Sequence, residues 1–152
     1  MPDRSSKSST PIAHSGRRVV VRDESMRPTL YPGDHLRVDR HAYAHSLPVP
    51  GEIIILRDPE RRSRWLVKRV AAIGPGRFWL FRDRLERLDG PVSSAAPEGA
   101  TELVELRAGE VFVLSDRLVG ARDSRRFGPV PGASVVGRVV FRTGPAERAG
   151  PL

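Results

Sequence analysis

The chain lacks cysteine: none occurs among its 152 residues. This absence excludes disulfide bonds and thiolate metal sites. Long apolar runs are missing too, since the longest span about five residues and a membrane-spanning helix needs roughly 20. The N-terminal stretch 1–15 also has no apolar segment typical of a secretory signal peptide. We therefore expect a protein without a transmembrane anchor, located in the cytoplasm.

Lysine is scarce, because 24 of the 26 basic residues are arginine and only Lys7 and Lys68 are lysine. Arginine cannot lose its proton whereas lysine can, so this composition suggests that lysine is kept where its chemistry is needed. Lys68 lies in the apolar run 65–73, and period-two alternation groups it with three apolar side chains, namely Leu66, Val70 and Ala72. Desolvation there lowers the pKa of an amine and can leave it neutral near pH 7.

Ser25 is the candidate partner of this lysine. It follows the apolar run 19–21 and precedes a Pro/Gly turn at 31–34. A serine in such a place is most often a turn or cap residue. A neutral Lys68 amine, however, could take the proton from the Ser25 hydroxyl and make it a nucleophile.

The order of the sequence motifs resembles that of signal peptidase I-type serine proteases. The motifs are Ser25-Met26-Arg27-Pro28-Thr29-Leu30, Gly51-Glu52-Ile53-Ile54-Ile55, Lys68-Arg69-Val70 and Asp123-Ser124-Arg125-Arg126-Phe127-Gly128. The resemblance implies a mostly β fold in which the Ser25 and Lys68 strands converge, with a Ser/Lys dyad. We expect no cofactor. The implied partner is a precursor protein with a cleavable N-terminal extension. The short length and the segment 123–131 are most similar to a soluble branch, the nickel-type superoxide dismutase maturation proteases, whose substrate would be a nickel superoxide dismutase precursor.

The chain departs from the family pattern around both predicted catalytic residues. Family members commonly have a small Gly or Ser two residues before the nucleophile, and this chain has Asp23. An ionised carboxylate cannot donate to an oxyanion, which leaves the amide of Ser25 as the candidate donor. Many signal peptidases also have a serine near the lysine where this chain has Ala121. These departures keep open a catalytically degenerate protease fold that serves as a binding module.

Other residues are predicted to support the site. Family members usually have Gly-Asp-Asn where this chain has Ser115-Asp116-Arg117, so only the carboxylate of Asp116 is kept. Asp123 and Arg125 are retained. We interpret them as a structural ion pair that braces the wall near Lys68.

Short strands at roughly ten-residue spacing, without a helical period, predict a mostly β single domain, a folded sheet or barrel of short strands. The family resemblance implies the same, a signal-peptidase-like fold. We expect strands at 17–22, 35–38, 51–57, 65–73, 78–81, 101–106, 111–114 and 135–142. A charged hairpin turn is expected at 60–64. The domain should span 17–142 with an exposed insertion at 82–100, between disordered tails at 1–16 and 143–152.

A net charge of +8 permits a different function, a basic β-barrel that binds nucleic acid. Its signature would be aromatic and basic side chains on one surface. The segment 77–82 offers one such cluster, but it is isolated and the charges are scattered along the chain. A solvated arginine-rich surface explains the composition better, so we expect no nucleic-acid partner.

Histidine offers two further alternatives. Ser25, His35 and Asp39 imitate a Ser/His/Asp constellation, yet all lie around one tight turn and nothing places the imidazole against the hydroxyl. A metal could be bound by His35, His41 and His45, but no carboxylate or thiol ligand accompanies these histidines. We therefore expect no metal. Self-cleaving repressor-type proteins also use a Ser/Lys pair, but they need an Ala-Gly site upstream of the serine, which is absent here.

Overall fold

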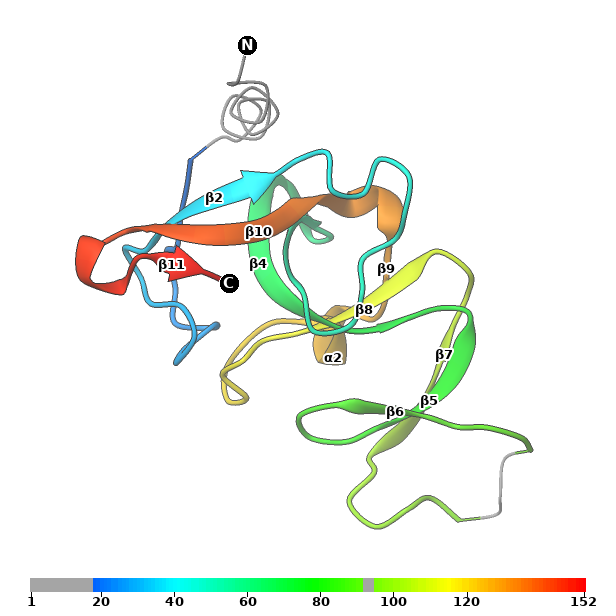
Figure 1. Cartoon of the computed structure of the whole chain (residues 1–152). Coiled ribbons are helices and arrows are strands. Elements are labelled where there is room, and N and C mark those ends of the chain that lie inside the picture. The colour runs from blue at the N-terminus through cyan, green and yellow to red at the C-terminus, as the bar shows by residue number, and fades with distance from the viewer. Residues whose placement is uncertain (1–17, 92–94) are drawn as a thin grey trace.

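The computed structural model describes residues 18–91 and 95–152 (Figure 1). Antiparallel strands form an eight-stranded sheet and a separate three-stranded sheet. This architecture confirms the predicted mostly β domain. The helical segments among these described residues are short: α2 (Ser124–Phe127), η1 (Gly132–Ser134) and η2 (Ala146–Arg148).

The larger sheet carries the predicted catalytic residues. Its strands follow the order β1-β2-β10-β3-β4-β8-β9, and β11 pairs with β10. They are β1 (Val19–Val20), β2 (His35–Asp39), β3 (Ile53–Asp58), β4 (Arg61–Ile73), β8 (Glu110–Leu114), β9 (Val130–Pro131), β10 (Val135–Gly144) and β11 (Gly150–Pro151). The smaller sheet contains β5 (Gly76–Leu80), β6 (Leu85–Arg87) and β7 (Glu102–Leu106), and in Figure 1 it lies at the end of the molecule away from β2 and β10.

The long strand β4 shows the predicted alternation. Leu66, Lys68 and Val70 are buried, because every second side chain of a strand points to the same face. The predicted turn at 60–64 is wrong. Asp58 pairs with Arg61, so the turn is shorter and 61–64 belong to β4 even though their side chains are exposed.

Two buried side chains anchor the turn that carries Ser25. Met26 and Leu30 are 1% and 0% exposed, and they pack in one cluster with residues of β2, β3 and β10, among them Leu36 and Ile55. Full burial of such side chains contributes about 1.5–3 kcal/mol each. The residue after Ser25 thus fixes the turn to the core, while Ser25 itself stays half-buried at the surface.

The C-terminal residues 143–152 differ from the expected disordered tail. They complete β10, form η2 and return as β11, which pairs with β10 at Phe141 and Arg142. The physical reason is a buried charge, because Arg148 forms an ion pair with Asp34, whose side chain is fully buried. Arg148 also lies over the ring of Tyr31, 5.2 Å from the centroid.

The predicted insertion 82–100 is largely exposed where the structure describes it. It is not entirely irregular, because β6 lies within it and pairs with β5. The predicted N-terminal tail 1–16 lies outside the described residues. Within the described chain, no helix is long and apolar enough to cross a membrane.

Candidate active site

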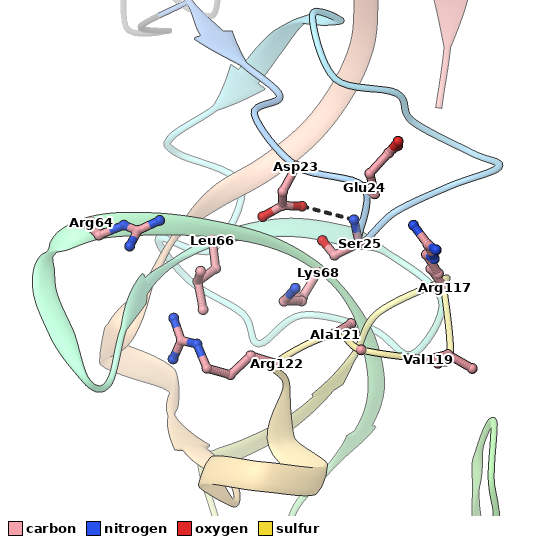
Figure 2. Close-up of a pocket in the computed structure, with 11 residues that line it drawn as sticks. Asp23, Glu24, Ser25, Arg64, Leu66, Lys68, Arg117, Val119, Ala121 and Arg122 are labelled. Carbon is pink, nitrogen blue, oxygen red and sulfur yellow. Dashed lines mark hydrogen bonds between the residues drawn. The ribbon is translucent and has the colours of Figure 1, made fainter.

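Ser25 and Lys68 face the same cavity, as Figure 2 shows. The cavity has a volume of about 410 Å³, and Asp23, Leu66 and Ala121 also line it. Ser25 comes from the turn after β1 and Lys68 from the middle of β4. The structure therefore brings together two residues that lie far apart in the sequence. In the described chain they face each other without a hydrogen bond between the hydroxyl and the amine.

Lys68 is 2% exposed. Burial lowers the pKa of its amine, and this effect outweighs the attraction of the Asp23 and Asp123 carboxylates, which raises the pKa. The positive charges of Arg122 and Arg125 lower the pKa further. A lysine with a lowered pKa is more often neutral near pH 7 and can then accept a proton.

Asp23 binds the backbone of Ser25. The Ser25 amide donates to Asp23 Oδ1 over 2.9 Å (Figure 2). Burial alone would raise the pKa of the Asp23 carboxyl, but the hydrogen bonds from Ser25 and the charge of Lys68 outweigh burial and lower it. The sequence analysis predicts this amide as the oxyanion donor. In the structure, the same amide is already bound to the Asp23 carboxylate.

Asp116 ties the Ser25 turn to β4. The Arg69 guanidinium donates to both carboxylate oxygens over 2.8 and 2.7 Å, and Thr29 Oγ1 donates to Oδ2 over 2.6 Å. Hydrogen bonds to charged groups and bidentate pairs are among the stronger ones in proteins. The Arg117 amide also donates to the Ser25 carbonyl over 2.8 Å. The segment 116–117 thus fixes the turn on the side of the cavity opposite to Asp23.

Asp123 organises the wall below Lys68. Its carboxylate is fully buried, accepts from the Ser115 amide over 2.8 Å, and caps α2 by accepting from the Arg125 amide over 3.0 Å. The Arg125 guanidinium reaches the same carboxylate over 2.9 and 2.7 Å and donates to the Leu118 carbonyl over 3.1 Å. This pair therefore holds the loop that contains Ala121, which lines the cavity with a methyl group.

Comparison with known proteins identifies the family. The sequence model of a protein family described as "Signal peptidase, peptidase S26" matches residues 12–143. The chain belongs to this family. It is thus a serine peptidase of the kind that removes N-terminal peptides from precursor proteins.

Two sequence relatives agree with this membership, and a solved structure is also similar. The mitochondrial ATP-independent inner membrane protease subunit 1b of Arabidopsis thaliana is 34% identical over 129 residues, which cover 84% of this chain and 70% of that protein. The probable signal peptidase I-1 of Synechocystis sp. is 31% identical over 144 residues, covering 87% and 73%. A crystal structure of a signal peptidase I from Enterococcus faecalis has 24% identity and a TM-score of 0.45, and the match covers 60% of this chain and 95% of that chain.

Three arginines around the cavity were not predicted from the sequence. Arg64 and Arg117 are exposed at its rim, and Arg122 donates to Asp58 Oδ1 over 3.0 Å and to Glu60 Oε1 over 2.5 Å. In a chain with 24 arginines, no sequence signal separates these from the rest. Arg69 and Thr29, in contrast, lie inside the motifs that contain Lys68 and Ser25, so the motifs carried a signal for them.

A second cavity of about 300 Å³ continues from Ser25. Its walls are the segments 19–23 and 64–67, so it runs between the β1 segment and the start of the buried part of β4. These walls include strand β1 and part of strand β4, which are both extended. An extended peptide can bind there by adding a strand.

The alternative sites do not assemble. Within the described chain, neither His35 nor Asp39 lines the two cavities at Ser25, and the Asp39 carboxylate accepts from the amide of His41 over 2.9 Å. In residues 18–91 and 95–152, no group of three His, Asp or Glu side chains is arranged to hold a metal ion. His35, His41 and His45 therefore form no metal site in this structure.

Proposed function

We propose that the protein is a serine endopeptidase with a Ser25/Lys68 dyad, which removes an N-terminal extension from a precursor protein. The observation that supports it most is the convergence of the Ser25 hydroxyl with a buried lysine of lowered pKa in one cavity. Asp116, Asp123 and Arg125 are supporting residues in this proposal, because they position the turn and the wall rather than touch the reacting atoms.

In this mechanism the neutral amine of Lys68 takes the proton of the Ser25 hydroxyl as Oγ attacks the scissile carbonyl carbon. The tetrahedral intermediate collapses when the Lys68 ammonium gives its proton to the leaving amine. A water molecule, deprotonated by the same amine, then hydrolyses the Ser25 ester and releases the acyl part of the substrate. As the ester bond breaks, the Lys68 ammonium returns this proton to Ser25 Oγ, so Lys68 ends the cycle neutral and the Ser25 hydroxyl is restored.

The intermediate carries a negative oxygen that needs a donor. The Ser25 amide is suited to this role, but it is bound to Asp23 at 2.9 Å. Because two anions would compete for one N–H, the amide must leave Asp23 when the oxyanion forms. Asp23 therefore opposes the first chemical step in this mechanism.

The substrate is proposed to bind as an extended strand in the groove beside 19–23 and 64–67. The segment 123–131, which resembles the soluble maturation proteases, supports a nickel superoxide dismutase precursor as that substrate and the cytoplasm as the location. Incubation of such a precursor with the purified protein tests the substrate. Mass spectrometry should show loss of the N-terminal extension, and an uncut precursor would argue against this substrate.

The dyad is tested with a serine-reactive acylating probe and intact-mass spectrometry. We expect one adduct on the parent protein and none on Ser25→Ala or Lys68→Ala. Lys7→Arg is the matched control, because it removes the only other lysine and should label like the parent. Circular dichroism should show that all variants remain folded.

A catalytically degenerate binding module is the second candidate function. The occupied Ser25 amide and the missing hydroxyl at Ala121 favour it. The same experiment decides, since folded parent protein that resists several probes from neutral to alkaline pH would contradict the peptidase mechanism.

A further inference from the structure

The hydroxyl of Ser115 is buried without a partner. Ser115 is 2% exposed, and its Oγ forms no hydrogen bond with any of the residues that the structure describes. A buried polar group that lacks a partner lowers stability, so such groups are uncommon and need an explanation. Alanine or glycine would avoid the problem at this position.

Strand register places Ser115 opposite Lys68. β4 and β8 are antiparallel, with Arg69 paired to Leu114 and Val70 to Val113. Continuing this register by one residue brings Ser115 across from Lys68. Side chains of directly opposed residues point to the same face, with Cβ atoms roughly 4.5–5.5 Å apart.

The neighbouring side chains agree with this placement. Val70 and Val113 lie in one core cluster, which is the face of Lys68 and Ser115. On the opposite face, Arg69 binds Asp116. The Ser115 hydroxyl is therefore on the same side of the sheet as the Lys68 amine.

The backbone of Ser115 is fixed at the site. Its amide donates to the buried Asp123 carboxylate over 2.8 Å, and two residues later the Arg117 amide donates to the Ser25 carbonyl over 2.8 Å. Ser115 thus lies on the segment that connects the wall below Lys68 with the nucleophile turn.

We propose that Ser115 is a positioning residue for Lys68, an inference that rests on the proposed Ser25/Lys68 mechanism. Its Oγ accepts one N–H of the amine, and this contact turns the lone pair of the amine toward Ser25. Rotation about the terminal bonds of the lysine side chain closes the contact. Ser115 thereby supplies, from the other strand, the hydroxyl that is missing at Ala121.

The scarcity of lysine allows a direct test. Protein labelled with ¹³C at lysine Cε gives signals from Lys7 and Lys68 only, and Lys7→Arg assigns them. The titration needs no catalytic activity and is carried out in a Ser25→Ala background. There, Ser115→Ala should lower the titration midpoint of Lys68 by roughly half a pH unit to one pH unit, because an acceptor for the ammonium is lost. An unchanged midpoint would overturn the proposal.

Acylation rates provide the second readout. Ser115→Ala should slow acylation of Ser25 about tenfold, and adding Ala121→Ser should restore most of the rate. A purely structural Ser115 would instead leave the rate unchanged. If the parent is not acylated at all, the proposed mechanism fails, whereas a shifted Lys68 midpoint would still support the contact with Ser115.

Discussion

The two flanks of Ser25 are held in different ways. On the C-terminal flank, Thr29 and Arg69 bind the Asp116 carboxylate across three segments of the chain. On the N-terminal flank, one exposed carboxylate, Asp23, accepts from an amide two residues away. In the proposed mechanism, the first arrangement fixes the nucleophile in place, and the second occupies the N–H group that the transition state needs. The comparison teaches that hydrogen bonds to one turn can have opposite effects on its chemistry.

Removing the charge of Asp116 should have the largest effect. Asp116→Asn loses the bidentate contact with Arg69, so we expect the free energy of unfolding to fall by about 2–3 kcal/mol and acylation to become at least tenfold slower. Urea unfolding measures the first change. Asp83→Asn is the matched control, because its partner Arg84 is exposed and such pairs contribute only ~0–1 kcal/mol. Equal stability of both variants would contradict a structural role of Asp116.

Removing Asp23 should change the rate in the opposite direction. Asp23→Ala frees the Ser25 amide for the oxyanion, and one such donor is worth about 10²–10³ in rate. We expect acylation to become about tenfold faster, with little change in stability. Glu24→Gln is the control, since this carboxylate binds Arg27 and not Ser25. Slower acylation in Asp23→Ala would show that Asp23 assists the site.

Lys68 lies between the two flanks, and its burial should reduce stability. The pKa of its amine is lowered in the folded state, so between that pKa and the ordinary lysine value the unfolded chain binds more protons and stability rises with pH. Lys68→Met should therefore add ~0.5–2 kcal/mol at neutral pH, and less above pH ~10. Denaturant unfolding at both pH values checks this. A methionine variant less stable than the parent at neutral pH would contradict it.

The smallest effect concerns the pH dependence of acylation. The rate should rise with pH and level off above the pKa of Lys68, because only the neutral amine accepts a proton. The Asp23 carboxylate raises that pKa, so Asp23→Ala should move the midpoint to lower pH, by less than one unit. Acylation rates between pH 6 and 10 test the shift. A midpoint that moves upward would exclude the expected charge effect of Asp23.

Much of this arrangement could be predicted from the sequence. Alternating apolar residues define β4 and the burial of Lys68, because a strand has a strict two-residue period. The family resemblance, which the order of the motifs carries, implies the proximity of Ser25 and Lys68. Local pattern failed at 61–64, where charged residues continue β4, and at 143–152, where a distant ion pair between Arg148 and Asp34 orders the chain.

The contacts around Ser25 could not be predicted in the same way. A carboxylate two residues before a serine can point to solvent or bind its amide, and only the backbone of the turn determines which occurs. Likewise, the bond from the Arg117 amide to the Ser25 carbonyl depends on tertiary placement, since backbone groups carry no sequence signature. Register, rather than motif, brings Ser115 to Lys68.

The return of the C-terminal segment has a practical consequence for handling the protein. Arg142 donates to the Thr29 carbonyl over 2.8 Å, and Arg148 covers the ring of Tyr31. Residues 142–148 therefore contact the C-terminal end of the turn that carries Ser25. A purification tag fused after Leu152 would disturb these contacts, and a truncation before η2 would remove those of Arg148. Preparations that differ only at that terminus should consequently differ in probe reactivity, and tags are better placed at the other end.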